Sequence, residues 1–526
     1  MDASDIEAAD GQPIGAASPW LKLLTAAVAL GATAFAVGHA GQPLLEAHGF
    51  RQTQTAITAY WMIRDGWRLA YETPVAGYPW AIPFEFPVYQ TLVAVIAKAG
   101  GWPLDPIGRL VSFAFLLGCA WPAALITRRL ALPRQTAWVF CALLWSSPIY
   151  LFWGRTFMIE TAALFFAFAA IPYGLDLLGP NSSWHAAVLC TAFGALACLQ
   201  KVTTGAPVVL ALGCLWLIQR IRRGGPRLPP LREIGMAFCA FGVPLLLAVA
   251  WTRYTDIVKS ANPFGVTQTS SAIRDWNLGT LQQRLQLSTY ATVIWHRMLV
   301  PNAAGIVGFG LIGGALLVPS AARIRAIVAA ALVLFLLPIV LFTNLHVEHD
   351  YYQSACALFL IAALAVAAGA WAPTVVRHPA VVPVLTSLLV AANGHAFVRG
   401  YGPIARKVIT AGHSRVLSVA GVLRQHTPPG SAFVAFGRGW SSEFAYYAER
   451  KAFMVPHDFS GYRRAWDDPA AFLGGTPLGA LVVCPSKWGL TIEDARSRAG
   501  SDTQWALMEV NDCGILINQA NQARAP

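Results

Sequence analysis

This 526-residue chain contains few charged residues. Asp, Glu, Lys and Arg make up 12% of it, whereas hydrophobic residues make up 56% and the mean hydropathy is +0.52. A soluble chain of this length carries roughly twice that share of charged residues. The composition therefore excludes a large soluble protein and predicts a polytopic membrane protein.

Several short motifs are missing as well. The sequence contains no Walker A loop, no GxSxG elbow and no CxxC pair, so chemistry on cytosolic nucleotides has no support. The net charge of +12 arises from short Lys/Arg clusters between apolar runs, not from a basic stripe with interleaved aromatic residues. We therefore expect no nucleic-acid partner.

Apolar runs predict about eleven transmembrane helices. Segment 86–101 is apolar but short and contains Lys98, so we expect it to be interfacial or re-entrant. A second short helix, Thr53–Met62, is expected to lie along the membrane surface. The expected spans are 20–39, 107–127, 135–153, 159–178, 184–199, 203–219, 233–252, 303–319, 324–343, 354–372 and 379–397.

The arginine clusters predict which ends of these spans face the cytoplasm. If segment 86–101 does not cross, the arginine clusters of four loops fall on one side, which the positive-inside rule makes the cytoplasm. These clusters contain Arg128, Arg129, Arg134, Arg220, Arg222, Arg223, Arg227, Arg232, Arg323, Arg325 and Arg377. The first apolar run begins near Trp20 and follows acidic residues in place of a basic region, so we expect no cleavable signal peptide. We expect a cytoplasmic tail at 1–19, a transmembrane domain at 20–398 with an exoplasmic loop at 40–106, and a soluble exoplasmic domain at 399–526.

The last 130 or so residues have the composition of a soluble domain. Strand-like runs at 431–436, 480–484 and 514–518 alternate with helical patterns around 404–424 and 491–499, which predicts a small α/β domain with a partly parallel sheet. Cys484 and Cys513 lie in this part. They could pair if it faces an oxidising compartment, but their spacing alone does not decide the matter.

The loop at 40–106 carries the first group of candidate site residues. Arg51 with Gln52 and Gln54 suits an anion, because arginine favours planar phosphate contacts. Glu85 is flanked by phenylalanine and proline, surroundings that raise the pKa of a carboxylate and suit a general base. The alternative is a carboxylate that caps backbone amides of the loop.

Ionisable residues at membrane depth form the second group. Glu160 stands where GRTFMIE enters an apolar span, and Lys201 stands between two short apolar runs. Such residues are functional candidates by default, and a lysine suits a phosphate. A structural Arg155–Glu160 pair and a lysine that extends to the membrane interface are the alternatives.

The segment LHVEHDYYQ at 345–353 forms the third group. Its H-x-E-H spacing would permit a divalent metal, although the cluster is short and no fourth ligand is identifiable. An interfacial belt of Tyr351 and Tyr352 is the alternative.

The order and shared sidedness of these elements resemble the GT-C superfamily of integral-membrane glycosyltransferases. The match is nearest to the family of protein O-mannosyltransferases and lipid A aminoarabinose transferases, glycosyltransferase family 39-like, over residues about 20–400. Arg51 in HGFRQTQTA stands at the family's first-loop arginine, with His48 and Gly49 in place of its acidic pair. Glu85-Phe86-Pro87 is similar to the family's Glu-Lys-Pro-Pro without the lysine. Further matches are Glu160, Lys201, His349, Tyr351 and Tyr352.

This resemblance implies a GT-C fold and an inverting transfer of a sugar from a polyprenyl-phosphate donor to a glycan, lipid or protein acceptor. It implies a multi-pass protein of a bacterial cytoplasmic membrane, with its active site facing the periplasm and no obligatory cofactor. A divalent metal is not expected. The implied roles are catalysis for Glu85, His48 and Glu46, donor-phosphate binding for Arg51, Lys201, His349 and Tyr352, and orientation of the acceptor or loop for Glu160, Arg155 and Gln52.

A transporter or flippase for a lipid-linked glycan is the alternative. It explains the spans and buried charges equally well. It explains the soluble domain and the one-sided polar loops less well, because transporters place their sites near the membrane midplane, often between inverted repeats.

Overall fold

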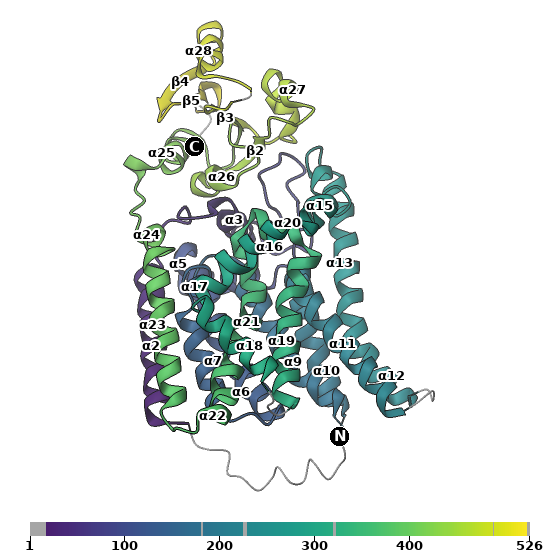
Figure 1. The fold of residues 1–526 in the computed structure, drawn as a ribbon. Helices are drawn as coiled ribbons and strands as arrows, with labels where there is room; N and C mark the ends of the chain where they lie inside the picture. The colour runs from purple at the N-terminus through teal and green to yellow at the C-terminus, as the bar shows by residue number, and fades with distance from the viewer. Residues whose placement is uncertain (1–16, 180–181, 225–228, 319–321, 488, 523–526) are drawn as a thin grey trace.

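The computed structural model describes residues 17–179, 182–224, 229–318, 322–487 and 489–522. Figure 1 shows a bundle of long helices with a small sheet domain at one end, built by the C-terminal residues. The expected cytoplasmic tail lies almost entirely outside the described residues, as does Arg227.

Eight helices in the described part of the chain are long and apolar enough to cross a membrane. Another helix pair, Leu287–Asn302 and Ile306–Leu317, meets the same criterion together but bends by 98°. The chain is thus a multi-pass membrane protein. The eight helices are α2 (Pro19–Gly38), α5 with α6 (Leu104–Arg129), α9 (Glu160–Leu178), α11 (Val202–Gly224), α12 to α13 (Leu231–Ser260), α19 (Ala322–Leu341), a helix at Asp350–Val375 that contains α21 and α22, and α23 (Val381–Arg399).

Three of the expected spans are helical but shorter or broken. The segment at 135–153 divides into α7 (Gln135–Ser146) and α8 (Pro148–Trp153), because a proline at 148 cannot continue the hydrogen bonding of α7. Helix α10 (Trp184–Gln200) has 17 residues. The span expected at 303–319 is reduced to α18 (Ile306–Leu317).

Two short helices flank the loop that carries Glu85. α4 (Val88–Gly100) has 13 residues and extends about 20 Å, less than the ~30 Å of hydrocarbon, so it is too short to span. The helix expected on the membrane surface at Thr53–Met62 is part of α3 (Gly49–Asp65), and that placement is wrong: all of the Thr and Gln side chains of α3 are buried. Figure 1 places α3 between the bundle and the C-terminal domain. Thr53 bonds to Ser442 of that domain, Oγ to Oγ at 2.7 Å.

The C-terminal domain contains a five-stranded sheet in the order β2-β1-β3-β5-β4. The first three strands are parallel and the last three antiparallel, so the expected partly parallel sheet is confirmed. Strands β2 and β4 were not anticipated. The strands are β1 (Ala432–Phe436), β2 (Lys451–Val455), β3 (Leu478–Val483), β4 (Trp505–Val510) and β5 (Cys513–Asn518), with helices α25 (Arg415–His426), α26 (Glu443–Ala448), α27 (Tyr462–Asp467) and α28 (Ile492–Ser501) around them.

Two connections tie this domain together and to the bundle. A disulfide joins Cys484, after β3, to Cys513 at the start of β5, so the two cysteines do pair. The loop between α3 and α4 pairs with the free edge of β2: the amides of Ala452 and Met454 donate to the carbonyls of Pro74 and Val75 at 3.0 and 2.8 Å. The loop that carries Glu85 is therefore anchored on the C-terminal sheet.

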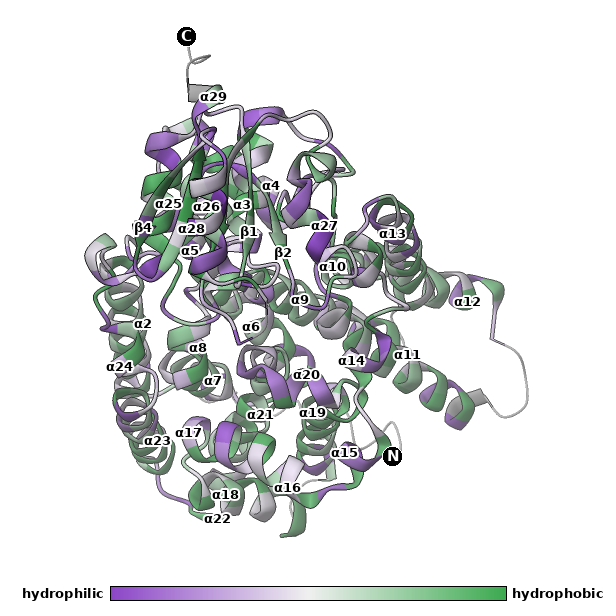
Figure 2. Ribbon diagram, turned by 90° about the horizontal axis from the view of Figure 1, so that it is seen from above, coloured by the Kyte–Doolittle hydropathy of each residue, from purple (hydrophilic) through white to green (hydrophobic). Residues whose placement is uncertain are grey.

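The arginine-rich loops lie far from that domain. α6 (Ala120–Arg129), α12 (Leu231–Ala237) and α22 (Ala372–Val375) stand at the opposite end of the bundle in Figure 1. The segment 253–298, which lies between the expected spans 233–252 and 303–319, contains the end of α13 and several short helices near the C-terminal domain. Seen from above, the C-terminal domain covers one side of the bundle and leaves α16 (Leu287–Tyr290) and α18 uncovered (Figure 2).

Candidate active site

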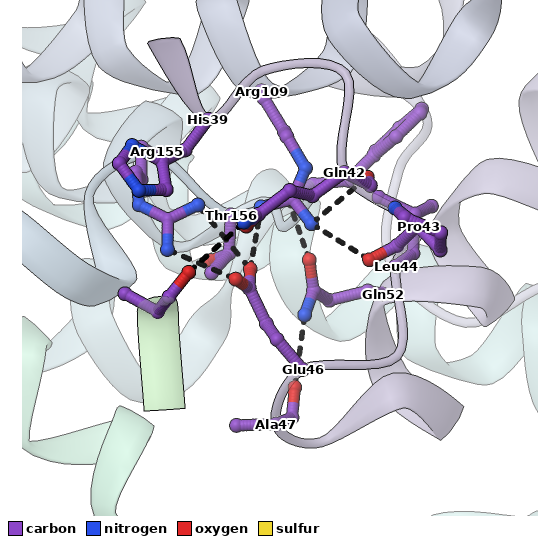
Figure 3. A network of polar contacts seen from close by, with 12 residues as sticks. His39, Gln42, Pro43, Leu44, Glu46, Ala47, Gln52, Arg109, Arg155 and Thr156 are labelled. Atoms are coloured by element: carbon purple, nitrogen blue, oxygen red, sulfur yellow. Dashed lines mark hydrogen bonds and ion pairs between the residues drawn. The ribbon is translucent and has the colours of Figure 1, made fainter. Parts of the chain in front are cut away.

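A buried ion triad lies at the end of the bundle next to the C-terminal domain. Arg109 on α5 and Arg155 before α9 donate to the two carboxylate oxygens of Glu46, at 2.5 and 2.9 Å. Their side chains are 0%, 1% and 1% exposed. Figure 3 shows both guanidinium groups directed at this carboxylate.

The charge balance of the triad keeps Glu46 ionised. Burial would raise the pKa of its carboxyl, but Arg109 and Arg155 outweigh burial and lower this pKa below its ordinary value. Both oxygens are engaged, so no acceptor hydroxyl can reach them. This placement argues against Glu46 as a base. It also shows that the Arg155–Glu160 pair considered from the sequence does not form.

Gln52 connects two loops next to the triad by hydrogen bonds. Its amide nitrogen donates to the carbonyl of Ala47 at 2.8 Å, and its oxygen accepts from the amide of Phe157 at 3.2 Å. Gln52 is fully buried. It therefore links the entry to α3 with the loop before α9, and it does not point into open space (Figure 3).

A second cluster of charges lies beside this triad. Lys201, just after α10, forms an ion pair with Glu160 at the start of α9, and both side chains are buried. The Lys201 ammonium lies 3.9 Å from the ring centroid of Tyr352 and 5.3 Å from that of Tyr351. The ring faces favour a cation at this depth.

Arg51 forms the other ion pair of the cluster. It pairs with Glu85 and donates to Gln54 Oε1 at 2.7 Å. Burial would lower the pKa of Arg51, but Glu85 and Glu160 outweigh it and hold this pKa well above the ordinary value. The influence of Glu160 shows that the two ion pairs are neighbours. The apolar surroundings expected for Glu85 are thus replaced by a guanidinium.

Backbone hydrogen bonds hold the loop that carries Glu85 against the end of α10, close to Lys201 in the sequence. The Tyr71 hydroxyl donates to the Glu85 carbonyl at 2.7 Å. The next amide, that of Phe86, donates to the carbonyl of Leu199 at 3.0 Å, two residues before Lys201. The loop at 84–88 is therefore fastened to the end of α10.

Two histidines, His48 and His349, complete this cluster. His48 Nε2 lies 3.3 Å from Asp350 Oδ1, and its ring is in edge contact with those of His349 and Tyr351. The His349 ring stacks on Tyr351 and Tyr352. Burial, His48 and Lys201 lower the pKa of His349 to about 4, so at neutral pH it is an uncharged hydrogen-bonding group.

The structure thus brings seven of the ten proposed residues into one cluster, places Glu46 and Arg155 in the adjacent triad, and places Gln52 next to that triad. Sequence reasoning included Asp350 in the group at 345–353 without giving it a role of its own, and it missed Arg109. Arg109 could have been found from the sequence, because an arginine within an apolar helix is a functional candidate.

Within the described residues, no three His, Cys, Asp or Glu side chains are grouped as for a metal ion. The cluster consists of Arg51, Lys201, Glu85, Glu160, His48, His349 and Tyr352.

No protein-family model and no curated protein matches this sequence. Solved structures do match it. One is ArnT from Cupriavidus metallidurans bound to undecaprenyl phosphate, with a TM-score of 0.59 and 16% identity over 97% of this chain and 100% of ArnT. Another is arabinofuranosyltransferase AftD from mycobacteria, with a TM-score of 0.55 and 16% identity. That match covers 97% of this chain but only 40% of AftD.

This chain has the GT-C fold. The match to ArnT extends over nearly the whole of both chains, so it includes the helical bundle and the C-terminal domain. The expected fold class, a polytopic helical membrane protein with a small C-terminal α/β domain, is confirmed. In this GT-C structure the charged cluster lies at the end of the bundle that faces the C-terminal domain.

Proposed function

We propose that the protein is an inverting membrane glycosyltransferase that moves a sugar from a polyprenyl-phosphate donor to an acceptor. One observation carries the proposal: Arg51 and Lys201 each form an ion pair with a carboxylate at the bundle end, and both act electrostatically on the same residue, His349. Two cations at this depth suit a lipid-linked phosphate. ArnT, which has the same fold, has been solved with undecaprenyl phosphate bound, and this supports the donor class.

The two cations take different parts in this proposal. Arg51 and Glu85 are partly exposed, at 12% and 22% of their side chains, so a phosphate can displace the carboxylate from the guanidinium. Lys201 stays against Glu160 and Tyr352 and adds a fixed positive charge. Together they offset the negative charge that develops on the leaving phosphate. His349 and Tyr352 line the same place as neutral donors.

The acceptor hydroxyl requires a base. Glu85 and His48 are accessible enough to receive a proton, whereas Glu46 is enclosed by two arginines. Glu160 orients Lys201, while Arg155 and Gln52 hold the loops that carry the cluster. No metal takes part in this scheme, because Arg51 and Lys201 supply the positive charge.

In this proposal the cluster faces the exoplasmic side, which in a bacterium is the periplasmic face of the inner membrane. The arginine pattern of the sequence supports this through the positive-inside rule. The arginine-rich loops at the far end of the bundle support this orientation. The acceptor is then a glycan, lipid or protein of the cell envelope, and the lipid tail of the donor lies between spans.

Turnover in detergent with a panel of polyprenyl-phosphate sugars tests the proposal. Wild type should release polyprenyl phosphate, and Lys201→Ala and Arg51→Ala should each lose about 10²-fold or more in turnover, the range for a group that stabilises transition-state charge. Lys407→Ala, an exposed lysine outside the cluster, is the matched control and should behave as wild type. Tight binding of a donor without its consumption would contradict the enzyme and favour a transporter.

A further inference from the structure

The accessible side of the cluster contains a histidine held by a carboxylate. His48 Nε2 lies 3.3 Å from one oxygen of Asp350. The other oxygen accepts a hydrogen bond from the Tyr401 hydroxyl at 3.2 Å, and that hydroxyl accepts one from Trp153 Nε1 at 3.2 Å. Asp350 is therefore fixed from both sides, and the imidazole is fixed by it. An imidazole bound through one nitrogen keeps the other free to accept a proton.

The backbone at His48 supports a functional reading. Its φ of 43° and ψ of 45° lie in the left-handed region, which residues other than glycine adopt uncommonly. Strain of this kind persists where the surroundings impose it, and it gathers at functional sites. His48 caps α3 one turn before Arg51, so one helix start positions both side chains.

The positions of His48 and Glu85 relative to the two cations differ, and this difference favours His48 as the base. In an inverting displacement the acceptor oxygen and the leaving phosphate stand on opposite sides of the sugar carbon, so the base and the phosphate-binding cations must be apart. Glu85 touches Arg51 directly. His48 does not pair with either cation. The ring of Tyr351 contacts both His48, at 4.9 Å between centroids, and Lys201.

We propose that His48 is the general base for the acceptor hydroxyl and that Asp350 is the residue that positions it. This rests on the glycosyltransferase function proposed above. The acceptor O–H bond breaks and its proton goes to the free nitrogen of His48. The acceptor oxygen bonds to the sugar carbon, the bond from that carbon to the phosphate oxygen breaks, and polyprenyl phosphate leaves with the electron pair. The proton then passes from His48 to water.

Replacement of His48 by glycine tests whether His48 acts as a base or only supports the structure. Glycine adopts a positive φ without strain, so His48→Gly keeps the backbone and opens a space the size of an imidazole. This variant should lose about 10²–10⁴-fold in turnover, the usual contribution of a general base. Added imidazole should restore part of the turnover at saturating donor. His457→Gly, at an exposed histidine of the C-terminal domain, is the matched control and should show neither effect.

The pH profile tests Asp350. The titratable groups in contact with His48 are Asp350, His349 and Tyr351. Removal of the carboxylate charge in Asp350→Asn disfavours the imidazolium, so the acidic limb of the kcat profile should move to lower pH. Tyr401→Phe should move it less, because it removes a bond to Asp350 and no charge.

The outcomes separate the two proposals. Full turnover in His48→Gly, with Glu85→Gln inactive, would overturn the role of His48 and leave the glycosyltransferase standing. A wild type that binds polyprenyl-phosphate sugars and consumes none would overturn both. Thermal stabilisation by polyprenyl phosphate, measured on each variant, establishes that the cluster is still folded. An inactive His48→Gly that retains this stabilisation and responds to imidazole supports the proposal.

Discussion

The ammonium of Lys201 stands 3.9 Å from the ring centroid of Tyr352 while it pairs with the buried carboxylate of Glu160. One lysine thus joins α9, α10 and the start of the span at Asp350–Val375. Its charge is balanced by a single carboxylate and supported by a ring face. An anion that enters the cluster therefore meets a cation that is already oriented.

The ring of Tyr352 should contribute to donor binding through this contact. Tyr352→Leu removes the ring face and should weaken binding of polyprenyl phosphate by about 5–30-fold, corresponding to ~1–2 kcal/mol for a desolvated cation on a ring. Tyr352→Phe keeps the face and should bind within about twofold of wild type if the ring alone matters. Titration calorimetry in detergent measures both. Equal loss in the two variants would assign the effect to the hydroxyl instead.

Glu46 should matter for stability and not for the chemical step. Glu46→Gln leaves Arg109 and Arg155 buried without a counter-charge, which should cost about 3–5 kcal/mol of unfolding free energy. Denaturant unfolding in detergent measures this loss. Glu509→Gln, in an exposed ion pair with Arg496, is the control and should change stability little. If the Glu46→Gln variant were stable but inactive, Glu46 would again be a candidate for the base.

Acid should destabilise the fold through His346. This side chain is 2% exposed, and burial and Lys201 lower its pKa to about 3. In the unfolded chain the pKa is near the ordinary value of about 6.5, so the unfolded state binds the proton first as the pH falls. The contribution of His346 is therefore complete above pH ~6.5 and is lost progressively toward pH ~3.

The measurement for His346 is the melting temperature as a function of pH. Wild type should lose stability between about pH 6.5 and 3, and His346→Gln should show a shallower slope over that window. His378→Gln alters an exposed histidine and serves as the control. A slope that is unchanged in His346→Gln would mean that other groups carry the acid sensitivity.

Trp440 should couple the C-terminal domain to the cluster. Its ring packs on Phe50 and Phe84, which directly precede Arg51 and Glu85, and on Phe264. Trp440→Ala should loosen the loops that carry this ion pair and lower kcat at least tenfold, since small misplacements at a reacting centre cost about 10²-fold. Trp440→Phe should retain most of the turnover. Limited proteolysis should find the loop at 73–87 more accessible in Trp440→Ala, and unchanged proteolysis and turnover would refute the coupling.

The sequence indicated most of the cluster but not its pairings. Arg51, Glu85, Glu160 and Lys201 stood out because charge is rare in an apolar chain and costly at membrane depth. Partners were harder to assign. A pair between Arg155 and Glu160, five residues apart, was one of the alternatives, whereas in the structure Arg155 pairs with Glu46 and Glu160 pairs with Lys201. Buried charges pair with whichever opposite charge the fold brings within contact, and separation along the chain does not set that distance.

The sequence by itself determined the membrane class, most of the apolar spans, the non-spanning segment 86–101 and the partly parallel sheet, because hydropathy and strand periodicity are local properties. Only the tertiary structure decided that α3 is buried, since the C-terminal domain covers it and Ser442 bonds to Thr53. It alone placed Asp350 against His48 as well. Both are contacts between segments hundreds of residues apart, and such contacts depend on how the helices and the sheet pack.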